Sequence, residues 1–293
     1  QTAKGEVIYH VCQRSFYDSN GDLNGDLNGL RQKLDYLQDL GVTSIMLLPL
    51  YEADCYHNYF ANDFEKIDPE FGTMQEYLEL VKDIHKRGMK IYMDMESQYV
   101  TAKHVWWKDA VGNLKSEYSD YLLFDDAEHK IPATMVFDLR ELKSYDGSII
   151  KVTTVNLKSP KVLDYNIRLF SFFMDPNKDG MFDDGVDGFR LDHAMDHLDG
   201  KPTLTNLFTE FWKPLIAEIK KVNPKISIYS PASGIIDGTE TMANASTPAM
   251  QSASNNTEIL NVKEGNYIKK GEVVFKLVNT DKVWGIFNVS QGY

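Results

Sequence analysis

The sequence predicts an α/β fold with a parallel sheet, because short apolar runs alternate with segments of helical periodicity. The chain has 293 residues and is 43% hydrophobic, which is the composition of a globular protein. Continuous apolar runs at residues 7–12, 44–50 and 90–95 predict buried strands. Between them, residues 30–40 place leucines at helical spacing before Gly41, and residues 74–87 predict a second helix that ends at Gly88.

The alternation continues after a long interruption. Residues 96–154 predict an irregular insertion, since loops of this length are uncommon without a function. Helices are then expected at residues 162–174 and 204–222, and strands at 186–192 and 226–229. Residues 230–256 are rich in Ser, Ala, Thr, Asn and Gly, which indicates a linker. Residues 261–289 predict short strands, and therefore a C-terminal β-rich segment.

Composition excludes several classes of protein. The formal net charge of −12 argues against a nucleic-acid partner, which requires a basic face. No apolar run reaches the roughly 18 residues of a transmembrane segment. Two cysteines, Cys12 and Cys55, do not make a disulfide scaffold. No signal peptide is apparent, and Gln1 is consistent with the start of a processed chain.

Acidic residues mark the ends of the predicted strands. Asp94 and Asp192 lie at the ends of the strands predicted at residues 90–95 and 186–192. Asp63 lies in the loop after the second predicted strand, residues 44–50. Catalytic sites of βα barrels lie at that end of the sheet, although Asp is equally favoured as a helix N-cap. Arg190 precedes Asp192 by two residues, so both side chains point to one face and the arginine is expected to keep the carboxylate ionised. A glycosidase nucleophile requires such a carboxylate, and a structural ion pair is the alternative.

Three segments resemble the α-amylase family of glycoside hydrolases: residues 16–50, residues 57–73 (HNYFANDFEKIDPEFGT) and residues 187–192 (DGFRLD). The resemblance covers residues 5–225. It implies a (β/α)8 barrel with a small domain after strand three, here residues 96–154. It also implies action on α-glucosidic bonds by a retaining double displacement.

The resemblance assigns roles to individual residues. Asp192 matches the family nucleophile and Arg190 the arginine of the same motif. Tyr59 matches the tyrosine that stacks under the sugar ring, and apolar sugar faces suit such stacking. Asp63 and Asp94 match structural acids of the family motifs, and His104 lies where the family lines its cleft; with Tyr59, these residues are the expected substrate-binding set.

The chain departs from the family at several positions. Gln98 and Tyr99 replace the usual Asn-His, and Met195 and Asp196 replace Lys-His. A retaining mechanism needs a second carboxyl group about 5–5.5 Å from the nucleophile. The family supplies it as a Glu after strand five, where this chain has Ser230 and Pro231. About five of the eight barrel strands are recognisable, so the barrel is expected to be incomplete.

The tail, residues 226–293, resembles the lipoyl and β-barrel segments of periplasmic adaptor (membrane fusion) proteins of efflux pumps. A generic antiparallel β module is the alternative. The expected organisation is therefore residues 1–95 as the first part of a catalytic barrel, 96–154 as the insert, 155–225 as the barrel continuation and 226–293 as the tail.

Two loops alternate oxygen-bearing side chains at every second position, with a glycine for the turn, which is typical of Ca²⁺ loops. Asx turns in a solvated loop are the alternative. In both loops the fourth residue of the pattern, Asn24 or Met181, would bind the cation through its backbone carbonyl. The expected ligands are Asp18, Asn20, Asp22, Asn24 and Asp26 in the first loop, and Asp175, Asn177, Asp179, Met181 and Asp183 in the second.

The leading hypothesis is a secreted or periplasmic enzyme of the α-amylase type that acts on α-glucans or maltooligosaccharides. Asp192, Arg190 and Tyr59 form its expected site. Weak or no hydrolysis is expected, because the family's general-acid Glu is not found at its place after strand five. The alternatives are a catalytically inactive carbohydrate-binding protein, and an adaptor-like interaction protein whose tail contacts an envelope protein.

Overall fold

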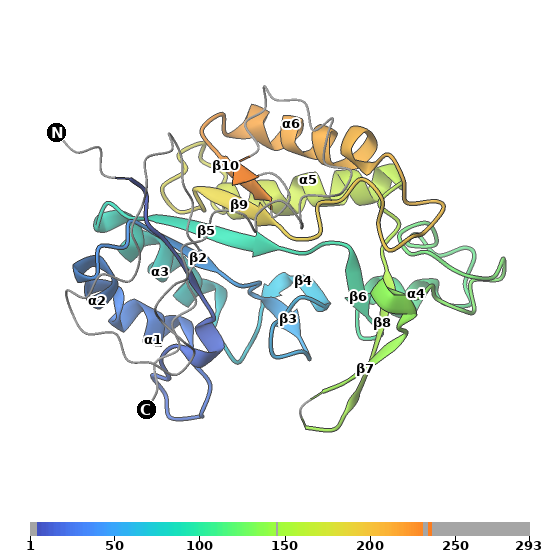
Figure 1. Ribbon diagram of the computed structural model, residues 1–293, viewed down its shortest axis with the longest axis horizontal. Helices are drawn as coiled ribbons and strands as arrows, with labels where there is room; N and C mark the ends of the chain where they lie inside the picture. The colour runs from blue at the N-terminus through green and yellow to red at the C-terminus, as the bar shows by residue number, and fades with distance from the viewer. Residues whose placement is uncertain (1–4, 145, 231–233, 236–293) are drawn as a thin grey trace, which may run out of the picture.

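A computed structural model describes residues 5–144, 146–230 and 234–235, and these form two sheets (Figure 1). The larger sheet has the order β1-β2-β5-β9-β10-β11. Its first five strands are parallel, and β11 runs antiparallel to β10. The strands are β1 (Ile8–Val11), β2 (Ser44–Leu47), β5 (Lys90–Met95), β9 (Gly188–Leu191), β10 (Ser227–Ser230) and β11 (Gly234–Ile235).

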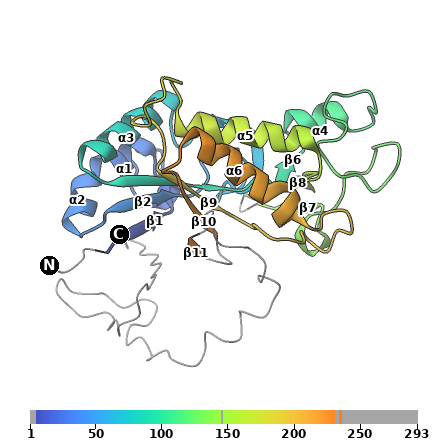
Figure 2. The same cartoon turned by 90° about the horizontal axis from the view of Figure 1, so that it is seen from above.

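Helices connect the parallel strands and lie outside the sheet (Figures 1 and 2). One group, α1 to α3, lies beside β1, β2 and β5, and the other, α5 and α6, lies beside β9 and β10. Within these groups α1 packs on α3 and α5 packs on α6. The helical elements are η1 (Gln13–Ser15), α1 (Leu27–Gln32), α2 (Leu34–Asp39), α3 (Met74–Lys86), α5 (Pro160–Met174), the π-helical turn η3 (Phe208–Trp212) and α6 (Lys213–Val222).

Two predicted helices differ in detail. The first begins earlier than expected, because Asp26 caps it by accepting from Gly29 N, and it breaks at Lys33. Its inward leucines Leu30, Leu34 and Leu37 are fully buried. The helix predicted from residue 204 starts only at Phe208, since Asn206 adopts a positive φ of 58° that a right-handed helix does not allow.

The smaller sheet has the order β3-β4-β6-β8-β7 and extends beyond the end of β5 (Figure 1). Residues 96–154 are therefore more regular than the sequence indicated, because strands of three residues are too short to show a period. The elements are β3 (Tyr51–Ala53), β4 (Ala61–Ile67), β6 (Tyr99–Thr101), α4 (Val105–Ala110), η2 (Val136–Asp138), β7 (Glu141–Lys143) and β8 (Ile149–Thr154).

The fold is an incomplete (β/α)8 barrel, with five parallel strands in the described residues where a closed barrel has eight. The strands β3 and β4 precede the predicted insert but pair with it, through Ala61 and Val100. Most of the predicted tail, from residue 236 onward, lies outside the described residues. Within the described part, no helix combines the length and the apolarity needed to cross a bilayer.

An aromatic cluster joins the smaller sheet to α4. His104 caps this helix by accepting from Trp106 N, and its ring packs against Phe64 and Trp106 at centroid distances of 5.3 and 4.5 Å. His104 is only 2% exposed, and burial lowers its pKa to about 3. The imidazole is therefore neutral in the folded protein at neutral pH.

Gly188 is required by the close contact of β9 with both neighbouring strands. A Cβ at this position would lie 2.5 Å from Ser227 O and 2.8 Å from Tyr92 Cδ1. We expect Gly188→Ala to lower the free energy of unfolding by about 1–3 kcal/mol, because the clash overpacks a buried sheet. Urea unfolding measures this, with Gly5→Ala as control, since nothing lies within 4 Å of its Cβ. Equal losses in both variants would contradict the packing argument.

His104 is expected to make stability depend on acid. Its pKa is depressed from 6.5 to about 3, so the stability it contributes is present above pH 6.5 and is lost as pH falls toward 3. The loss amounts to about 3 kcal/mol by pH 4. His104→Asn keeps an acceptor for the helix cap but does not titrate, so its stability should fall less steeply on acidification.

Chemical unfolding from about pH 7 to about pH 4 provides the measurement for His104. His197→Asn is the control, because this side chain is 67% exposed. The assignment is wrong if wild type and His104→Asn lose stability in parallel.

Candidate active site

The ends of β5 and β9 bring a charged cluster together. Asp94 and Arg190 are partners in the strand register, and Arg190 Nη1 lies 2.6 Å from Asp94 Oδ2. The same Nη1 lies 2.9 Å from Asp192 Oδ1. The ion pair predicted from the spacing of Arg190 and Asp192 is thus confirmed, and one guanidinium bridges two carboxylates. Burial raises the pKa of Asp94 to about 7, although Arg190 and Tyr59 act in the opposite direction.

Tyr59 belongs to this cluster. Its hydroxyl donates to Asp94 Oδ2 at 2.6 Å and lies 3.3 Å from Arg190 Nη1. His10 Nε2 approaches the same Asp94 oxygen at 3.6 Å, and burial together with Arg190 lowers the pKa of His10 to about 4. Asp94 is completely buried, so its carboxyl group orients Arg190 and Tyr59 rather than facing solvent. The part of Asp192 that remains accessible is 16% of its side chain.

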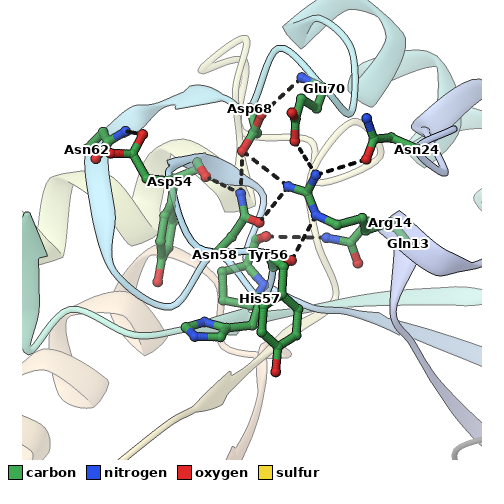
Figure 3. A network of polar contacts seen from close by, with 12 residues as sticks. Gln13, Arg14, Asn24, Asp54, Tyr56, His57, Asn58, Asn62, Asp68 and Glu70 are labelled. Carbon is green, nitrogen blue, oxygen red and sulfur yellow. Dashed lines mark hydrogen bonds and ion pairs between the residues drawn. The ribbon is translucent and has the colours of Figure 1, made fainter. Parts of the chain in front are cut away.

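The loop that carries Tyr59 is fixed by a polar network (Figure 3). Asn58 adopts a positive φ of 58°, which Asn tolerates, and its side chain donates to Tyr51 O and to Asp68 Oδ2. Arg14 donates to Asn58 Oδ1 at 3.2 Å and to Tyr56 O at 2.9 Å. The guanidinium also contacts Asn24, Glu70 and, at 3.7 Å, Asp68 Oδ2. The η1 segment after β1 therefore sets the position of the residue before Tyr59.

The sequence analysis missed Glu96 and His193. Ligand atoms of Glu96, Asp192 and His193 all lie within 4.8 Å of one another. Glu96 follows Asp94 by two residues at the end of β5, so strand alternation alone could have placed it on the same face. Gln98, a departure from the family motif, connects both sides of the cluster: its backbone N donates to Glu96 Oε1 and its side chain to Asp192 O.

The remaining predicted substrate-binding residues lie elsewhere. Asp63 lies within β4 of the smaller sheet rather than in a loop, and pairs with Lys66 at 3.0 Å. His104 is enclosed in the aromatic cluster, so its burial argues against direct contact with a sugar. Tyr99, at the family's histidine position, donates its hydroxyl to Asp199 Oδ2 at 2.6 Å.

The first predicted Ca²⁺ loop is organised by Asx turns. Asp18 accepts from Asn20 N, Gly21 N and Leu23 N, while Asp26 caps α1 and accepts from Ser19. Asp22 accepts from Asn24 N, and Asn20 accepts from Asp22 N. An ionised carboxylate has about four acceptor sites, so these oxygens keep capacity for a cation. The donor set fits Ca²⁺, which prefers oxygen ligands.

The second predicted loop is built in the same way. Asp175 accepts from Asp179 N and Gly180 N, and Asp179 accepts from Met181 N and from the Asn177 amide. The Met181 side chain is 62% exposed, which agrees with a role for its carbonyl only. The backbone carbonyl of Asp183 accepts a hydrogen bond from Nδ1 of His85 at 2.8 Å.

The fifth parallel strand, β10, ends at Ser230, where the family places its acid. No glutamate occurs between Glu218 and Glu240. Among the described residues, nothing after β10 supplies the second carboxyl group of a retaining pair.

Comparison with known proteins agrees with this architecture. The sequence model of the α-amylase catalytic domain matches residues 10–210. The chain is 29% identical over 223 residues to "Alpha-amylase 3" of Dictyoglomus thermophilum, which covers 76% of this chain and 42% of that protein. It is 33% identical over 201 residues to an oligo-1,6-glucosidase of Parageobacillus thermoglucosidasius, covering 64% of this chain and 34% of that protein. The chain thus spans less than half the length of these relatives.

Solved structures show the same fold. The crystal structure of an α-amylase from H. orenii superposes with a TM-score of 0.62 at 29% identity, covering 78% of this chain and 47% of that one. A GH13_31 enzyme superposes with a TM-score of 0.61 at 27% identity, covering 78% and 46%. Because the family's catalytic-domain model matches well over half of the sequence, this chain belongs to the α-amylase family.

Proposed function

We propose that the protein acts on α-glucans by a retaining mechanism in which Asp192 is the nucleophile. The observation that carries this proposal is the Arg190 guanidinium, which contacts both Asp94 and Asp192 from the neighbouring strand position. Asp192 Oδ1 forms an ion pair with Arg190 at 2.9 Å, and a carboxylate is the group that attacks an anomeric carbon. Tyr59, held by Asp94, supplies the ring on which the sugar stacks.

The substrate class is supported by the relatives. They include an α-amylase, oligo-1,6-glucosidases and a trehalose-6-phosphate hydrolase. We therefore propose an α-glucan or maltooligosaccharide as the substrate, and a secreted or periplasmic location where such polymers are met.

The general acid is the missing part of the site. Hydrolysis of an ordinary glucan requires protonation of the leaving oxygen, and the place for the acid after β10 holds Ser230. Hydrolysis of natural glucans by this chain should therefore be weak. A substrate whose leaving group departs without protonation isolates the step assigned to Asp192.

α-Maltosyl fluoride is such a substrate. An Asp192 oxygen forms a bond to the anomeric carbon while the carbon–fluorine bond breaks and fluoride leaves with the electron pair. We expect fluoride release that falls by at least about 100-fold in Asp192→Asn, because the amide is not a nucleophile. An ion-selective electrode follows fluoride, and Asp39→Asn, an exposed change at the end of α2, should behave as wild type.

Equal rates in wild type and Asp192→Asn would contradict the assignment. If fluoride release is absent but calorimetry detects binding of maltoheptaose that Tyr59→Ala weakens, the chain is a carbohydrate-binding protein instead, the alternative that the absent acid favours. The adaptor-like hypothesis concerns the tail, most of which lies outside the described residues, and it predicts binding to an envelope protein without any to glucan.

We further propose Ca²⁺ as a structural cofactor of the two Asx-turn loops. Each loop concentrates carboxylates next to a helix end, the first before α1 and the second after α5. A cation would offset this negative charge and fix the loop that leads from η1, and hence from Arg14, into α1. Its role would be structural, since the described side chains of the two loops form no hydrogen bond or ion pair with Asp192 or Arg190.

Ca²⁺ removal is expected to lower thermal stability. A ligand that binds only the folded state stabilises it by mass action, so chelation should lower the Tm by about 5 °C. Calorimetric titration of the stripped protein should show binding whose stoichiometry falls in Asp22→Ala and, separately, in Asp179→Ala. Asp39→Asn is again the control. Unchanged Tm and no heat of binding would identify the loops as Asx turns alone.

A further inference from the structure

The second carboxyl group beside Asp192 has no role in the function proposed above. Glu96 is 1% exposed and lies directly after β5. Two hydrogen bonds that involve the backbone hold it. Gln98 N donates to Glu96 Oε1 at 2.8 Å, and the Tyr51 hydroxyl donates to the Glu96 backbone carbonyl at 2.9 Å. Its other carboxyl oxygen faces Asp192 and His193, with which it forms a cluster of ligand atoms within 4.8 Å.

The charge balance of this cluster is unusual. Among the described residues, Arg190 forms ion pairs with Asp192 and Asp94 but none with Glu96. The nearest basic group is His193, whose Nδ1 lies 3.4 Å from Glu96 Oε2 without forming a hydrogen bond. Groups that titrate and face Glu96 come from every neighbouring element: Asp94 on β5, Tyr51 on β3, Tyr99 on β6, and Asp192 and His193 after β9.

A buried carboxylate next to a second carboxylate is unstable unless one of the two is protonated. Asp192 forms an ion pair with Arg190, and 16% of its side chain is accessible. Glu96, enclosed and without a paired cation, is the member that keeps the proton, and burial and the charge of Asp192 both raise the pKa of Glu96 well above its usual range. A carboxyl oxygen of Glu96 lies within 4.8 Å of a carboxyl oxygen of Asp192.

We propose that Glu96 is neutral in the folded protein and donates a hydrogen bond to the Asp192 carboxylate, which makes it a positioning residue for the nucleophile. This rests on the role proposed for Asp192. The hydrogen bond holds one Asp192 oxygen and leaves the other for the sugar, and it stabilises the charge that returns to Asp192 when the glycosyl–enzyme bond breaks.

Glu96 is not the missing general acid. The two carboxyl groups of a retaining pair stand about 5–5.5 Å apart with the sugar between them. A carboxyl oxygen of Glu96 lies within 4.8 Å of one of Asp192, and at 1% exposure Glu96 has no access to a leaving oxygen on the opposite side of the sugar. The Glu96 proton is therefore donated in a hydrogen bond to Asp192 and is not transferred to the leaving group.

Infrared difference spectroscopy tests the protonation state without any substrate. At about pH 7, wild type minus Glu96→Gln should show the carbonyl band of a neutral carboxyl group, although an ordinary Glu is ionised there. Glu6→Gln is the matched control. Glu6 lies at the opposite end of the sheet, its pKa is lowered by hydrogen bonds from Ser44 and Tyr92, and its removal should abolish no such band.

Fluoride release from α-maltosyl fluoride tests the positioning role. Glu96→Gln retains a donor of the same shape, so at about pH 7 its rate should stay within about twofold of wild type, whereas Glu96→Leu should lose about tenfold or more. At alkaline pH the wild type should slow as Glu96 ionises, and Glu96→Gln should not. A circular-dichroism spectrum shared by the three proteins establishes that Glu96→Leu is folded.

Absence of the neutral band in wild type would overturn the proposal. So would a divalent metal that co-purifies in wild type and is lost in Glu96→Gln, because both carboxyl groups would then be ionised ligands. A neutral band with no Asp192-dependent fluoride release leaves Glu96 protonated and instead refutes the function proposed for Asp192, so the two failures are distinguishable.

Discussion

The bridge that Arg190 makes between Asp94 and Asp192 is the interaction on which the rest of the site depends. One guanidinium nitrogen contacts a buried carboxylate on β5 and a partly accessible one after β9. Removing the cation would leave Asp94 as a buried carboxyl group without its ionic partner, a change that typically costs several kcal/mol. The same bridge orients Tyr59, since the tyrosine hydroxyl and Arg190 share a single Asp94 oxygen.

The fold supplies this bridge through strand register. Parallel strands end at one edge, so residues far apart in the chain meet there when their register agrees, as Asp94 and Arg190 do. The smaller sheet contributes Tyr59 from the loop between β3 and β4, and Arg14, in η1 after β1, holds that loop through Tyr56 and Asn58. The Asp94–Arg190 contacts and the Arg14–Asn58 contacts thus both fix the position of Tyr59.

Five parallel strands do not close a barrel, and an open sheet exposes unpaired backbone groups at its edges. In the described residues β11 covers part of one edge by pairing antiparallel with β10. The chain spans less than half of the relatives it matches, and the part of a family member that follows the fifth strand is where the general acid is expected. In the described residues, the Asp192 cluster proposed as the nucleophile side of the site is present, and no carboxyl group follows β10.

Local sequence determined the strand–helix order, most of the helix positions and the Arg190–Asp192 pair, because hydrophobic periodicity and strand alternation act over a few residues. It also supplied Tyr59 and Asp94, through motifs. Tertiary structure alone decided that Asp94 is shared by Arg190, Tyr59 and His10, that His104 is enclosed among aromatic rings, and that Glu96 meets Asp192. Most of those contacts join residues that are tens of positions apart, and pairing between strands brings them together, as the register of β5 with β9 does for Asp94 and Arg190.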